Sequence, residues 1–140
     1  MTAAGLGIQV QPVMVAAPEE ADVAFATMAR EGAKAVLVQP IFANDVAIIA
    51  PLAARHGLAT ASSALFAKGG GTLVGYGATP ANIMRQAAGQ VDRIPKGAKP
   101  GDLPVEQPTR FELVINLKVA KELGLAVPDI VLARGDEVIE

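Results

Sequence analysis

Short apolar runs alternate along this chain with stretches that repeat apolar residues at helical spacing. Residues 35–38, 58–61 and 72–76 have the length and the composition of strands, and 35–38 is wholly apolar, which is typical of a strand covered on both faces. A strand–helix–strand order with short connections indicates a parallel sheet with right-handed crossovers. The sequence therefore predicts an α/β fold, a parallel sheet with flanking helices.

Start and stop signals predict three helices. The first covers residues 18–32 and opens at Pro18, since proline is tolerated in the first turn and the two acidic residues that follow suit the positive end of the helix dipole. The second covers 44–57, with Asn44 or Asp45 at its start and an internal proline expected to kink it. The third covers 79–94, where Thr-Pro opens the helix and Pro95 stops it.

Three other segments are less clearly patterned. Residues 8–15 alternate loosely and contain Pro12, which predicts a strand near a sheet edge. Residues 62–68 are compatible with one helical turn or with a loop. The glycine run 69–71 is typical of a turn or hinge, although its N–H groups could also cradle an anion.

The proline-rich stretch 95–108 predicts an extended, stiff connector between the third helix and an ordered tail. After it, residues 110–115 have the β-branched and aromatic composition of a strand. Asn116 is well placed to cap the next helix, and Gly124 can adopt the left-handed turn that ends it. We expect this tail to be clamped onto the rest of the protein.

The same stretch resembles the close of the ABC transporter substrate-binding protein family. The residues that carry the resemblance are Gly97-Ala98-Lys99-Pro100, Asp102-Leu103-Pro104-Val105-Glu106-Gln107-Pro108-Thr109, Phe111-Glu112-Leu113-Val114-Ile115-Asn116-Leu117-Lys118, Leu125, Pro128, Leu132-Ala133-Arg134 and Asp136-Glu137-Val138-Ile139. The resemblance covers nearly the whole chain, but only the C-terminal half of a full-length member. It implies part of a two-lobed, Rossmann-like receptor of the type I periplasmic-binding kind.

On this basis the chain divides into three parts. Residues 1–94 form an α/β lobe, the incomplete second lobe of the receptor, and its usual first strand and helix would precede Met1. Residues 95–108 form the connector, and residues 109–140 form a strand–helix tail that packs on the lobe.

Composition narrows the class of protein. The chain of 140 residues is 51% hydrophobic and 19% charged, which predicts a packed core. A net charge of -2 without a basic run argues against nucleic acid as a partner.

Residues 1–7 lack the basic and apolar regions of a signal peptide, and no apolar run approaches the roughly 20 residues that span a bilayer. The family is extracytoplasmic by resemblance, whereas this chain would stay in the cytoplasm if it is the complete product.

Candidate binding residues lie in three loops that follow the predicted strands, residues 39–44, 62–66 and 76–79. Small ligands bind beyond the carboxyl ends of parallel strands, and each of these loops places polar groups beside apolar ones. The residues expected to contact a ligand are Gln39, Phe42, Asn44, Ser62, Ser63, Tyr76 and Thr79. Phe42 and Phe66 are equally compatible with roles in the core. The helix starts at Asn44 and Thr79 could present N–H groups to a carboxylate.

No residue pattern indicates catalysis, a metal or another cofactor. Cysteine is absent, and the single histidine, His56, lies at a helix end, where a protonated imidazole is favourable. Ser62 and Ser63 are not in a Gly-x-Ser-x-Gly elbow, and no phosphate-binding Gly-Lys-Ser/Thr appears. An enzyme is therefore the least favoured of three interpretations.

The favoured interpretation is a non-enzymatic solute receptor or a truncated fragment of one. The resemblance implies a small organic solute, with amino acids among the ligands, and an ABC permease as partner. In the second interpretation the chain is a freestanding α/β interaction module without a transport role. An open strand edge and an apolar face would then predict a homodimer, with the segment 104–124 as a candidate for exchange between copies.

Overall fold

The computed structural model describes residues 3–140, apart from the side chains of residues 43, 44, 46 and 47. Its centre is a five-stranded sheet in the order β1-β2-β3-β4-β5. The strands are β1 (Ala35–Leu37), β2 (Ala59–Ser62), β3 (Val74–Gly77), β4 (Glu112–Asn116) and β5 (Glu137–Ile139). β1, β2 and β3 are parallel, β4 is antiparallel to β3, and β5 is parallel to β4. The predicted α/β fold is confirmed, and the sheet is parallel except for the pair β3–β4.

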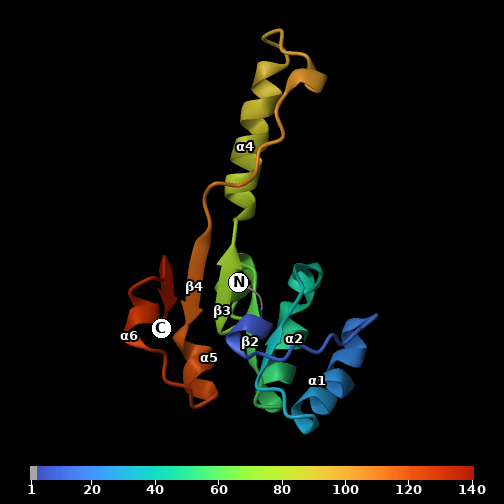
Figure 1. Cartoon of the computed structure of the whole chain (residues 1–140), viewed down its shortest axis with the longest axis vertical. Helices are drawn as coiled ribbons and strands as arrows, with labels where there is room; N and C mark the ends of the chain where they lie inside the picture. The colour runs from blue at the N-terminus through green and yellow to red at the C-terminus, as the bar shows by residue number, and fades with distance from the viewer. Residues whose placement is uncertain (1–2) are drawn as a thin grey trace.

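Within residues 3–140, six α-helices accompany the sheet, most of which are labelled in Figure 1. They are α1 (Ala21–Arg30), α2 (Val46–Arg55), α3 (Ala64–Lys68), α4 (Pro80–Arg93), α5 (Leu117–Glu122) and α6 (Asp129–Leu132), with short 3-10 turns at Ala4–Leu6, Pro18–Glu20, Pro40–Asp45 and Pro100–Asp102. The three helices predicted from start and stop signals correspond to α1, α2 and α4. The segment left undecided between helix and loop forms α3, and the loop expected after β1 is a 3-10 turn. None of the helices within residues 3–140 combines the length and the apolarity needed to cross a bilayer.

One buried cluster joins α1, α2 and α3 to the sheet. Its largest members are Phe25 of α1, Ile49 of α2, Phe66 of α3, and Leu58 just before β2. His56 reinforces the contact between the two longer helices, because its Nε2 lies 2.8 Å from Asp22 Oδ1 on α1. Burial of these apolar side chains stabilises the packing of the three helices on the sheet.

Two predictions about strands were wrong, the first as a whole and the second in part. Residues 8–15 form no strand, and none of them has a sheet partner among residues 3–140. A period-2 pattern creates a strand only where a neighbouring strand offers hydrogen bonds, and these residues are mostly exposed. β1 is not covered on both faces, since Ala35 and Leu37 on one face are exposed, Leu37 by 75%, and Val36 on the other face is half-buried.

The tail after residue 110 behaves as predicted. β4 lies between β3 and β5, and Val114, Ile115 and Asn116 are buried. The Asn116 side-chain oxygen accepts hydrogen bonds from the backbone N–H groups of Lys118 and Val119, which confirms the predicted helix cap. Gly124 has φ 64°, the left-handed conformation expected after the helix.

α4 projects from the body as an arm, and the proline-rich connector returns beside it (Figure 1). The connector is held by glutamine side chains of α4: Gln86 Nε2 donates to Glu106 Oε2 at 3.0 Å, and Gln90 Nε2 donates to the Pro104 carbonyl at 3.3 Å. All of α4 lies in the described part of the chain, and none of its residues is buried. The division of the chain at residues 94 and 108 stays a prediction.

Candidate functional site

The three candidate loops begin at one edge of the sheet. β1, β2 and β3 run parallel, so their carboxyl ends at Leu37, Ser62 and Gly77 share that edge. β4 begins at the same place, because Glu112 pairs with Gly77. We call this the carboxyl edge; α4 rises from it (Figure 1).

An aromatic pair marks the carboxyl edge. The rings of Tyr76 and Phe111 are stacked, with centroids 5.7 Å apart and planes 16° from parallel. Tyr76 is 62% exposed and Phe111 is 47% exposed, so both rings present apolar surface to solvent. Sequence reasoning singled out Tyr76 but missed Phe111. The antiparallel pairing of β3 with β4 brings the two together, and only knowledge of that register could have revealed it.

The two serines after β2 are placed differently. Ser62 is buried, and its hydroxyl donates to the Val38 carbonyl at 2.7 Å, which ties the end of β2 to the end of β1. Ser63 is half-buried and stands at the start of α3. Thr79 has the equivalent position before α4, and within residues 3–140 neither hydroxyl bonds to the helix that follows it. The Ser62 hydroxyl proton is therefore used in a hydrogen bond within the protein. The hydroxyls of Ser63 and Thr79 do not cap the helices that follow them, as far as residues 3–140 show.

The candidate residues of the loop 39–44 differ in burial. Gln39 is exposed, and Phe42 is partly buried against the cluster around α1 and α2. Phe42 thus contacts the core, which was one of its two expected roles. The Asn44 side chain lies outside the described residues. Asp45 occupies the N-cap position of α2 without a capping hydrogen bond from its side chain, as far as the described part shows.

A chain of polar contacts connects the carboxyl edge to the arm. Lys68 Nζ of α3 lies 2.8 Å from Glu112 Oε2 and 2.9 Å from Glu137 Oε2, and hydrogen bonds to these two carboxylates raise the pKa of Lys68. On the other side of Glu112, Asn82 Nδ2 donates to Oε1 at 3.5 Å, and Arg85 Nη1 donates to Asn82 Oδ1 at 2.9 Å. The start of α4 is thereby linked to α3, β4 and β5.

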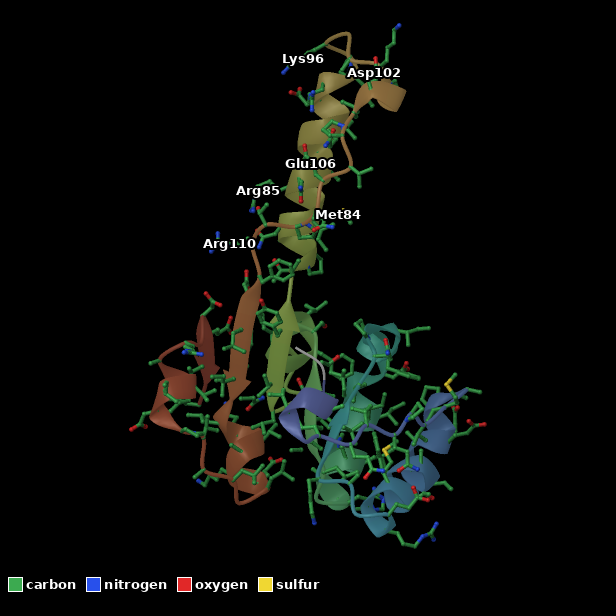
Figure 2. All side chains as sticks on the ribbon, in the orientation of Figure 1. Met84, Arg85, Lys96, Asp102, Glu106 and Arg110 are labelled. Atoms are coloured by element: carbon green, nitrogen blue, oxygen red, sulfur yellow. The ribbon has the colours of Figure 1, made fainter. Side chains whose placement is uncertain are left out.

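Two surface hollows are lined by residues outside the three candidate loops. One, of about 310 Å³, is at the opposite edge of the sheet, and its lining includes Leu58, Thr60, Gly71 and Leu123. The other, of about 390 Å³, is at the base of the arm, lined by Asn82, Arg85, Gln86, Glu106, Pro108, Thr109 and Arg110. Figure 2 shows Arg85 and Arg110 on one side of this base and Met84 on the other. Neither hollow includes a described residue of loops 39–44, 62–66 or 76–79. The candidate loops thus contribute no described residue to either of these two hollows.

No cluster of three or more His, Asp or Glu side chains that could hold a metal ion occurs among the described residues.

A sequence model of a family described as "ABC transporter substrate binding protein" matches residues 1–139. The chain belongs to the ABC transporter substrate-binding protein family. No sequence among the curated proteins matches it.

Solved structures show the same fold. A conserved domain protein from Vibrio cholerae has 24% sequence identity and a TM-score of 0.85, over 97% of this chain and 46% of its own. An ABC domain from Streptococcus pneumoniae, in complex with L-Trp, also has 24% identity and a TM-score of 0.85, over 98% of this chain and 47% of its own. A ligand-free, open substrate-binding protein with adhesive properties from Clostridium difficile has 16% identity and a TM-score of 0.68, over 98% and 46%. This member of the family therefore spans about half the length of these structures.

Proposed function

We propose that this chain is the solute-binding component, or a fragment of it, of an ABC-type uptake transporter. In this proposal the carboxyl edge forms one wall of a cleft, and a second lobe forms the other. The solute is a small organic molecule such as an amino acid, it is bound without being chemically changed, and the receptor delivers it to an ABC permease outside the cytoplasm.

The observation that carries the proposal is the exposed Tyr76–Phe111 pair at the carboxyl edge. Aromatic rings stack favourably on one another, and an exposed pair provides a flat platform for a further ring. The Streptococcus structure contains L-Trp, which supports an aromatic amino acid as the solute. The ring would stack on Tyr76, with Phe42 as the other candidate, and Gln39, Asn44, Ser63 or Thr79 would orient the polar end. In this arrangement the Ser62 hydroxyl holds the ends of β1 and β2 together at the carboxyl edge through its hydrogen bond to Val38.

The carboxylate of such a solute would lie at the start of α4. α4 has 14 residues, and the positive end of its dipole favours negative charge near Thr79. A single wall contacts only one side of the ligand, so we expect affinity on the order of millimolar for this chain alone.

Fluorescence of L-tryptophan tests the proposal directly, because the chain contains no tryptophan. Titrating the protein into L-tryptophan should change the ligand's emission in a saturable manner. Tyr76→Ala should abolish the change and Tyr76→Phe should retain it, while Val23→Ala, at an exposed position of α1, serves as the control. Equal binding of L-tryptophan by the wild type and by Tyr76→Ala would contradict the proposed site. So would a lack of binding by the wild type, by Tyr76→Ala and by a version of the receptor that contains both lobes.

A second candidate function is supported by the open edge at β1. An unpaired edge strand with an exposed Leu37 can pair with another chain, so the protein would be a homodimerising α/β module without a transport role. Leu37→Lys should then abolish dimers measured by light scattering. Exchange of the segment 104–124 would require β4 to leave its place between β3 and β5 of its own chain.

A further inference from the structure

The hollow of about 310 Å³ lies at the end of the sheet away from α4, where β2 starts and α5 follows β4 (Figure 1). Its walls are mainly apolar and include Ala54 of α2, Leu58 just before β2, and Leu123 just after α5. A hollow of this volume is at the lower end of the range for ligand pockets. It therefore suits a small molecule.

Thr60 places a polar group at this hollow that the chain itself does not satisfy. The residue lies in β2, lines the hollow and is only 4% exposed, and its hydroxyl forms no hydrogen bond within residues 3–140. The hydroxyl is not among the described polar atoms that are sealed from solvent without a partner, so it opens into the hollow. Ser62, two residues further along β2, is also buried but donates to the Val38 carbonyl. Buried hydroxyls normally have a partner, so the free Thr60 hydroxyl points to one from outside the chain.

The charge at the hollow favours a cation. Glu122 is the one charged residue among the described residues that line it, and its exposed carboxylate forms no ion pair or hydrogen bond within them. The backbone N–H groups of Gly70 and Gly71 are already used, since they donate to the carbonyls of Ala67 at 2.9 Å and Phe66 at 3.1 Å. These two glycines therefore offer no backbone N–H group to an anion, whereas Glu122 can attract a positive charge.

We propose that this hollow binds a small aliphatic amino alcohol. The ammonium group lies at the mouth beside Glu122, the carbon chain contacts the apolar walls, and the hydroxyl at the other end bonds to Thr60, whose own hydroxyl can both donate and accept. The site is at the opposite edge of the sheet from Tyr76 and Phe111. The inference is therefore independent of the solute proposed for the carboxyl edge.

Nuclear magnetic resonance of the isotope-labelled chain, titrated with a linear aminopentanol that has its two polar groups at opposite ends, tests the site. We expect saturable shifts at Thr60, Gly71 and Leu123, with a dissociation constant on the order of 1–10 mM for so small a ligand. Pentylamine, which lacks the hydroxyl, should bind about twofold to tenfold more weakly. Hydroxypentanoate, which has a carboxylate in place of the ammonium group, should cause no saturable shifts.

Two variants separate the roles of the polar groups. Thr60→Val should lower the affinity for aminopentanol to that for pentylamine. It should leave the melting temperature unchanged, because the hydroxyl has no hydrogen bond to lose within the described residues. Glu122→Gln should raise the dissociation constants of both amines about twofold to fivefold, as expected for an exposed ion pair. Glu19→Gln is the matched control, since Glu19 is an exposed acidic residue outside the hollow, and it should change neither constant.

Several results would overturn the proposal. They are an absence of saturable shifts with aminopentanol, equal binding of hydroxypentanoate, or affinities that neither Thr60→Val nor Glu122→Gln changes. A clear drop in the melting temperature of Thr60→Val would show that the hydroxyl has a partner inside the protein. Loss of binding in a version of the receptor that contains both lobes would show that the rest of that protein fills the hollow. Binding of aminopentanol while L-tryptophan fails to bind would contradict only the solute site at the carboxyl edge.

Discussion

Gly75 is glycine because α3 lies directly on it. A Cβ at this position would be 2.6 Å from the Ala67 Cβ, 2.6 Å from the Ser63 carbonyl oxygen and 2.8 Å from the Ala64 Cα. Two of these three atoms belong to backbone, which cannot move without shifting the helix. The close approach holds α3, and with it the loop after β2, against the carboxyl edge.

Gly75→Ala should therefore lower the free energy of unfolding by about 3 kcal/mol, the upper part of the usual range for overpacking. Gly89→Ala is the matched control, since a Cβ there meets no described atom within 4 Å and the residue is inside α4. That variant should stabilise the protein by about 0.5–1 kcal/mol, because alanine favours helix. Urea denaturation measures both, and equal effects of the two substitutions would contradict the packing of α3.

Asn116 connects β4 to α5 through its buried side chain. Its Oδ1 accepts hydrogen bonds from Lys118 N at 3.0 Å and from Val119 N at 3.3 Å. Asn116→Ala should cost about 1–2 kcal/mol of stability, and Asn116→Ser, which keeps an acceptor, should cost clearly less. Thermal denaturation of the three proteins measures the difference. Equal melting temperatures of the alanine and serine variants would show that the cap contributes little.

At the scale of elements, Lys68 holds the end of α3 to the starts of β4 and β5. Hydrogen bonds to Glu112 and Glu137 raise its pKa in the folded protein above the ordinary value of 10.5. The stability contributed by this raised pKa is fully present below about pH 10.5 and is lost as the pH rises through the folded-state value. Solvent screening keeps the contribution below about 1 kcal/mol, because the side chain is 34% exposed.

Urea denaturation at about pH 8 and pH 11 should show this loss in the wild type and a smaller loss in Lys68→Met. Lys118→Met, which removes an exposed lysine from α5, is the control for a general change of charge. A Lys68→Met variant that loses as much stability as the wild type would contradict the role of this ion pair.

Single residues in the sequence correctly predicted the helix boundaries that depend on the chemistry of those residues alone. Pro18, Pro80, Gly57 and Asn116 begin, end or cap helices by their own chemistry, and the structure has helix boundaries there. The prediction for residues 8–15 failed, because alternating apolar residues form a strand only where a neighbouring strand provides hydrogen-bond partners. Phe111 was missed for a related reason, since its contact with Tyr76 depends on the register between two strands 30 or more residues apart.

In the molecule as a whole, the topology supports a site outside the two hollows described above. Parallel strands bring the three candidate loops to one edge, and the stacked rings stand beside them. The hollow of about 310 Å³ lies at the other edge of the same sheet, around Thr60 and Gly71. A solute bound at the carboxyl edge and a solute bound in that hollow would contact different residues, so the two possibilities can be told apart.

The most direct test is therefore nuclear magnetic resonance of the isotope-labelled chain during titration with L-tryptophan, with L-alanine as the ligand that lacks a ring. A solute site at the carboxyl edge predicts progressive, saturable shifts at Ser63, Tyr76, Thr79 and Phe111 with L-tryptophan, and much weaker shifts with L-alanine. Shifts confined to Thr60, Gly71 and Leu123 at the opposite edge, or the same shifts with both ligands, would contradict it.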